Sequence, residues 1–132
     1  MTRLYVLVEG QTEEKFVKDV LASHLGSSVI VIPIIVTSRR EKSGKKRRGG
    51  GHWKHWLKDL LRLSGHDQGN QVRFTTLFDL YGLPDDFPEL ERHAAEQDTL
   101  RRVESLERAM ADVVSDWRLI PYLQLGWIAG LV

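Results

Sequence analysis

Hydrophobic residues in this chain form four short continuous runs. Runs of this kind, rich in Val, Ile and Leu, are typical of strands that are buried on both faces of a sheet. The runs span residues 4–8, 29–36, 72–78 and 119–125, and the last of them contains Pro121. Pro33, in the second run, indicates an edge position or a bulge, because proline cannot donate a ladder hydrogen bond.

Between these runs, apolar residues recur every three or four positions, as on one face of an amphipathic helix. The predicted helices run from Thr12 to about Gly26, from Trp53 onward, and from Leu100 to Val114. Strands and helices therefore alternate, which predicts an α/β fold with a mainly parallel, four-stranded sheet and helices on both faces. A doubly wound sheet of this kind has the strand order 2-1-3-4, and its ligands bind at the carboxyl ends of the strands.

The length and composition agree with one globular domain spanning residues 1–132. The chain contains no cysteine, so disulfides and thiolate metal sites are excluded and a reducing compartment such as the cytoplasm is expected. No run of about 18 apolar residues is present, which argues against a membrane span and against membrane partners.

Basic charge is concentrated in one Gly-rich segment, residues 38–51. Residues 39–48 contain seven Lys or Arg and one Glu, whereas the rest of the chain has 12 basic and 17 acidic residues. Such a segment either is a solvated loop or binds nucleic acid through phosphates. The candidate contacts are Arg39, Arg40, Lys42, Lys45, Lys46, Arg47 and Arg48, with Trp53 as a base-stacking side chain. All four tryptophans and Tyr81 are expected to pack in or over the core, and stacking on a base is an alternative for Trp53 only.

Two acidic residues directly follow predicted strands. Glu9 comes after the first strand and Asp79 after the third. If these strands are neighbours, the two carboxylates lie close enough to share a divalent cation such as Mg²⁺. Alternatively, Glu9 accepts hydrogen bonds from the following helix and Asp79 forms a turn. Glu13 and Glu14 are expected to be solvated partners of the helix dipole, with the alternative that Glu13 faces the site.

Three ordered motifs resemble a known family. They are V-E-G-Q-T-E-E at residues 8–14, F-D-L-Y-G-L-P at residues 78–84 with Asp86-Phe87-Pro88 after it, and I-P-Y-L-Q-L at residues 120–125. The chain thereby resembles the bacterial family of domain of unknown function 4276, which is regarded as Toprim-like. Members of this family also resemble partners of neighbouring ATPases in defence loci, so the resemblance implies an ATPase partner protein.

The Toprim resemblance implies phosphodiester chemistry that depends on Mg²⁺ or Mn²⁺, as in a nuclease. Glu9 would be a metal ligand or general acid/base, and Asp79 the principal metal ligand. Toprim domains carry a second Asp two residues after the first, but this chain has Tyr81 there. Asp85 and Asp86 are the remaining candidates for the additional metal ligands.

The C-terminal motif also departs from the family pattern. A His-Glu-Phe-Glu block is expected after I-P-Y-x-Q-L, whereas this chain continues with Gly126-Trp127-Ile128-Ala129. We therefore expect a truncated or degenerate member, either still active or a catalytically inactive subunit that binds nucleic acid or a partner protein. A missing last helix would leave an apolar edge exposed, which favours a homodimer.

Overall fold

The computed structural model of the chain describes residues 1–36 and 52–126, and its centre is a parallel sheet. The strands are β1 (Thr2–Val8), β2 (Val29–Ile35), β3 (Val72–Asp79), β4 (Leu119–Ile120) and β5 (Leu123–Gln124). Their order is β2-β1-β3-β4, and β5 also pairs with β3. Every pairing is parallel. The predicted fold class and strand order are therefore confirmed.

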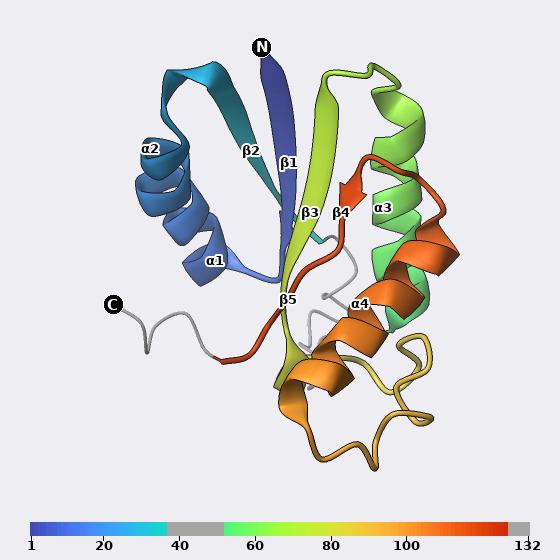
Figure 1. The fold of residues 1–132 in the computed structure, drawn as a ribbon. Coiled ribbons are helices and arrows are strands. Elements are labelled where there is room, and N and C mark those ends of the chain that lie inside the picture. Colours follow the sequence, from blue (N-terminus) through green and yellow to red (C-terminus); the bar gives the residue numbers. More distant parts are fainter. Residues whose placement is uncertain (37–51, 127–132) are drawn as a thin grey trace, which may run out of the picture.

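Helices cover both faces of this sheet, as Figure 1 shows. The main helices are α1 (Gln11–Phe16), α2 (Ala22–Leu25), α3 (Trp53–His66) and α4 (Thr99–Val114). A π-helical turn connects α1 with α2, and the helical segment ends near Gly26, whose φ of 76° suits a residue without a Cβ. In the described part of the chain, no helix is both long enough and apolar enough to span a membrane.

The register of β1 determines which residues meet at the carboxyl edge of the sheet. Val8 lies opposite Ile35 of β2 and opposite Leu77 of β3. The three strands therefore end at nearly the same level, as parallel strands in register must. β2 is at the edge of the sheet, which confirms the position that Pro33 predicted.

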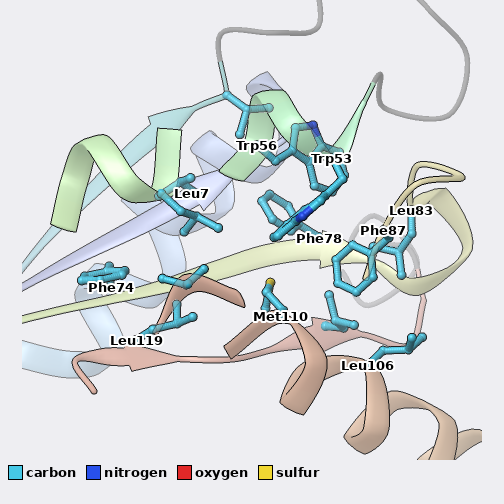
Figure 2. Close-up of a cluster of buried hydrophobic side chains, with 14 of the residues drawn as sticks. Leu7, Trp53, Trp56, Phe74, Phe78, Leu83, Phe87, Leu106, Met110 and Leu119 are labelled. Carbon is cyan, nitrogen blue, oxygen red and sulfur yellow. The ribbon is translucent and has the colours of Figure 1, made fainter. Parts of the chain in front are cut away.

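Side chains of β1 alternate between two hydrophobic clusters, one on each face. Val6 and Val8 pack with Val17 of the first helical segment. Leu7 points the other way, into the larger cluster under α3 and α4 (Figure 2). The fully buried aromatic residues of that cluster are Trp56, Phe74 and Phe78. Both faces of β1 are thus covered, as its continuous apolar run predicts.

The predicted fourth strand is interrupted. β4 ends before Pro121, which has no N–H to donate, and β5 begins after Tyr122. Two hydroxyls of β3 hold the interruption in place: Thr75 Oγ1 donates to the carbonyl of Ile120 at 2.7 Å, and Thr76 Oγ1 donates to that of Tyr122 at 2.6 Å. Side chains therefore replace the backbone ladder where proline breaks it.

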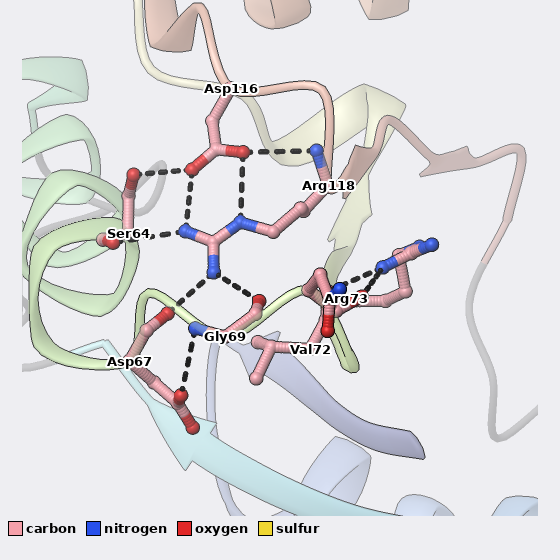
Figure 3. Close-up of polar contacts among 8 residues, drawn as sticks. Ser64, Asp67, Gly69, Val72, Arg73, Asp116 and Arg118 are labelled. Atoms are coloured by element: carbon pink, nitrogen blue, oxygen red, sulfur yellow. Dashed lines mark hydrogen bonds and ion pairs between the residues drawn. The ribbon is translucent and has the colours of Figure 1, made fainter. Parts of the chain in front are cut away.

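Arg118 ties together the connections at the opposite end of the sheet (Figure 3). The residue is only 5% exposed, and its side chain uses all five N–H donors. Two of them bind the carboxylate of Asp116, and three bind the carbonyls of Ser64, Asp67 and Gly69. One guanidinium thereby links the α3–β3 connection to the α4–β4 connection.

We expect Arg118→Lys to destabilise the fold by about 3 kcal/mol, because an ammonium cannot replace the five-donor fork and the partner carboxylate is left poorly paired. The melting temperature should fall by about 10 °C. The matched control is Arg108→Lys, an exposed arginine on α4. Thermal unfolding followed by circular dichroism measures both. Equal melting temperatures for the two variants would contradict this structural role.

Stability should also decrease in acid. Hydrogen bonding from Arg3, and then from Tyr5, lowers the pKa of Asp67 from 3.8 to about 2, and Arg118 lowers the pKa of Asp116. Because these pKa values are lower in the folded state, their stabilisation is complete above the unfolded pKa and is lost as the pH falls from about 4 toward 2. Urea unfolding at several pH values measures this slope. The slope should be shallower for Asp67→Asn, and an unchanged slope would exclude Asp67 as its cause.

Candidate metal and nucleic-acid site

Glu9 and Asp79 lie side by side at the carboxyl edge of the sheet. Glu9 follows the last residue of β1, and Asp79 is the last residue of β3, the strand paired with β1. Glu9 Oε1 accepts a hydrogen bond from the backbone N–H of Asp79 at 3.1 Å. The two acidic residues are therefore in direct contact, and both are half-buried.

The carboxylate of Asp79 also shapes the turn that follows it. Asp79 Oδ1 accepts a hydrogen bond from the backbone N–H of Tyr81 at 3.1 Å and caps the short helical turn Leu80–Gly82. Its other oxygen, Oδ2, accepts no hydrogen bond from residues 1–36 or 52–126. An ionised carboxylate has about four lone-pair sites. Asp79 can therefore form the turn and still bind a cation.

Two further polar side chains near this edge are buried, and the sequence did not identify Gln124 as a site residue. Gln124 of β5 lies opposite Asp79 and is 6% exposed. Paired residues of neighbouring strands project to the same face, so Gln124 projects to the same face as Asp79. Glu13, in the first turn of α1, is also 6% exposed, so the prediction that it is solvated is wrong. A glutamine within the apolar run 119–125 was the available signal for Gln124.

The prediction that Asp85 and Asp86 supply further metal ligands stays a prediction. Asp86 Oδ1 accepts a hydrogen bond from the backbone N–H of Trp53 at 2.8 Å and so anchors the start of α3. Asp85 lines a separate cavity beside Leu80. Among the described residues, no group of three or more His, Cys, Asp or Glu could hold a metal ion. Glu9 and Asp79 are thus the carboxylate pair that the structure brings together.

The expectation that Trp53 packs in the core is confirmed, and its burial disfavours the alternative that it stacks on a base. Trp53 is 6% exposed and packs edge-to-face against Phe87, with ring centroids 5.0 Å apart. Tyr81 is instead 70% exposed, contrary to the expectation that it packs over the core. The expected phosphate contacts Arg39, Arg40, Lys42, Lys45, Lys46, Arg47 and Arg48 lie outside the described residues.

The donor set of this site suits a hard divalent cation. Mg²⁺ is usually bound by one or two carboxylates, with substrate phosphates and water completing the octahedron. Glu9 and Asp79 supply two carboxylates, and Gln124, which lies opposite Asp79, carries an amide oxygen of the kind that such an ion accepts. A tetrahedral zinc site needs more protein ligands than this pair supplies. The residues present therefore fit Mg²⁺ or Mn²⁺.

Asp86→Ala should cost about 1 kcal/mol of stability, because the N–H of Trp53 at the start of α3 loses its acceptor. The affinity for Mn²⁺ should not change. Asp86→Asn keeps an acceptor oxygen and should restore most of the stability. Thermal unfolding and a Mn²⁺ titration measure the two quantities. A large loss of Mn²⁺ affinity in Asp86→Asn would show that Asp86 binds the ion after all.

Comparison with known proteins identifies one family. The family described as Domain of unknown function (DUF4276) matches residues 8–126, a range that includes Glu9, Asp79 and Gln124. Neither the curated proteins nor the solved structures yielded a match to this chain. Since the matched range covers most of the sequence, this protein belongs to the DUF4276 family.

Proposed function

We propose that this protein is a Toprim-like domain that hydrolyses phosphodiester bonds of nucleic acid with the help of Mg²⁺ or Mn²⁺. The observation that carries the proposal is the contact between Glu9 and Asp79 across the ends of β1 and β3. Two carboxylates at the carboxyl edge of a parallel sheet are where ligand chemistry is expected in this class of fold.

In this proposal Asp79 is the principal metal ligand. Its Oδ2 has no hydrogen-bond donor among the described residues, so it requires no rearrangement to bind a cation. The bound ion would stabilise negative charge that develops on the phosphate. Capping of the Leu80–Gly82 turn by Oδ1 fixes the rotation of the carboxylate, which keeps the ligand oxygen preorganised.

We assign to Glu9 a share in metal binding and the acceptance of a proton from the attacking water. Hydrolysis joins the water oxygen to phosphorus and breaks one ester P–O bond, and the departing oxygen takes up a proton from solvent. The hydrogen bond from the Asp79 amide holds Glu9 Oε1 in place. A base that is already oriented loses little entropy in the reaction.

The route of the chain supports nucleic acid as the substrate. The N–H of Val36 donates to the carbonyl of Val8 at 3.0 Å, so the chain leaves β2 directly beside the residue that precedes Glu9. The basic segment 39–48 begins three residues later. Positive charge attached at this edge would steer a polyanion toward the carboxylates.

A catalytically inactive subunit that binds nucleic acid or a partner protein is the second candidate. It is favoured by Tyr81, which stands where a Toprim domain has its second Asp, and by exposed apolar side chains around β4 and β5. Ile120 is 51% exposed, Tyr122 46% and Leu125 45%. Such a surface fits a homodimer or the ATPase partner that the family resemblance implies.

Nicking of supercoiled plasmid DNA in the presence of Mg²⁺ or Mn²⁺ tests the first candidate. Glu9→Gln and Asp79→Asn should each lower the rate at least 100-fold, because the charge that binds the ion or takes the proton is lost. Both variants keep the oxygen that accepts the observed backbone hydrogen bond, so the fold should be preserved. Glu104→Gln, an exposed glutamate on α4, is the matched control.

Metal-dependent nicking that persists in both site variants would exclude this pair from the mechanism. DNA binding without any nicking in the wild type would favour the inactive subunit. Retention on DNA at increasing salt completes the comparison: replacing Lys45, Lys46, Arg47 and Arg48 by Ala should weaken it strongly. Equal retention would remove the basic segment from the proposal.

A further inference from the structure

A cavity of about 480 Å³ lies directly beside the acidic pair. Its volume is within the range of about 300–1,000 Å³ that is usual for small-molecule sites. The apolar part of its wall comes from Leu80, Leu83 and Leu90. Leu80 and Tyr81, which also lines the cavity, immediately follow Asp79 in sequence. Because the N–H of Tyr81 also binds the Asp79 carboxylate, the wall of the cavity is in direct contact with Asp79.

The cavity contains a polar group that lacks a partner. Arg102 of α4 contributes to its wall, and the Arg102 Nε is buried without a hydrogen-bond acceptor among the described residues. A buried N–H without an acceptor costs about 1–3 kcal/mol. The Nε itself is closed to solvent, so a ligand would meet Arg102 only through the parts of its side chain that line the cavity, and an arginine offers donors there. The site therefore favours a ligand with an acceptor edge.

The charges of the wall restrict the ligand further. Asp85 and Glu91 line the same cavity as Arg102, so its formal charge is −1. An anionic ligand such as a free phosphate is therefore disfavoured, although the arginine requires an acceptor. The two carboxylates are acceptors themselves and require donors. These requirements describe a neutral ligand with an apolar body, an acceptor edge and a donor edge.

We propose that the cavity binds one unpaired guanine base of the nucleic acid whose phosphate lies at Glu9 and Asp79. The inference rests on the proposed function. Guanine has two neighbouring acceptors, O6 and N7, which suit an arginine. It also has two neighbouring donors, N1–H and the N2 amino group, which suit a carboxylate. Adenine lacks the N1–H donor, and uracil has only one ring donor.

Tyr81 provides the remaining element of such a site. Its ring is 70% exposed at the cavity wall, and its backbone N–H is bound by the Asp79 carboxylate. Exposed aromatic rings that line a nucleic-acid path stack on unpaired bases. The phenol ring and the leucine side chains would cover the base while its phosphate reaches the acidic pair. The substrate would then be single-stranded, or locally unpaired, at the cleavage site.

Titration of the full chain with guanosine, followed by ligand-observed NMR without divalent metal, tests the inference. Guanosine should bind more tightly than adenosine or uridine. Arg102→Met and Tyr81→Ala should each weaken guanosine binding about tenfold. Arg101→Met is the matched control, since Arg101 precedes Arg102 on α4 and its side chain is 78% exposed. Tyr81→Ala changes an exposed residue, so its result is informative even if Arg102→Met fails to fold.

Equal binding of the three nucleosides, or unchanged guanosine binding in Tyr81→Ala, would overturn the inference. These outcomes are separate from those of the nicking assay. Guanosine binding without metal-dependent nicking would leave the cavity assigned and remove the proposed function. Nicking that depends on Glu9 but shows no preference for positions next to guanine would retain the proposed function and remove the guanine site.

Discussion

The parallel pairing of β1 with β3 is the constraint on which the candidate site depends. Val8 lies opposite Leu77, so the residues that follow each strand emerge at the same edge. Glu9 and Asp79 are 70 residues apart in sequence, yet the backbone N–H of one binds the carboxylate of the other. A shift in register by one residue would turn the apolar side chains of β1 to the wrong faces and move Glu9 away from the N–H of Asp79. The hydrophobic clusters on both faces of β1 prevent such a shift.

The two ends of the sheet differ in how completely their polar groups are hydrogen-bonded. At one end, all five N–H groups of the Arg118 guanidinium donate hydrogen bonds to residues of the α3–β3 and α4–β4 connections. These hydrogen bonds hold the two connections together. At the carboxyl end the polar groups are only partly satisfied: Asp79 Oδ2 and Arg102 Nε have no partner among the described residues. Unsatisfied groups lower stability, and their concentration at the ligand-binding edge is what a functional site requires.

Similar side chains in one loop region have distinct roles because of their contacts. Asp79 caps its own turn and remains able to bind a cation, whereas Asp86 is committed to the start of α3. Asp85 lines a cavity whose wall also includes Arg102. The contacts of Asp85 and Asp86 therefore differ from those of Asp79, although all three residues lie in one loop region. The hydrogen-bond partner of each carboxylate decides whether it is structural or available.

The sequence by itself determined the alternation of strands and helices, the strand order, the edge position of β2 and the acidic residue at each of two strand ends. These features follow from local hydrophobic periodicity and from general rules of α/β topology. Tertiary structure alone decided that Trp53 is buried and Tyr81 exposed, that Pro121 divides the last strand, and that Gln124 joins Asp79. Burial and pairing depend on which distant segment covers a residue, and no local pattern contains that information.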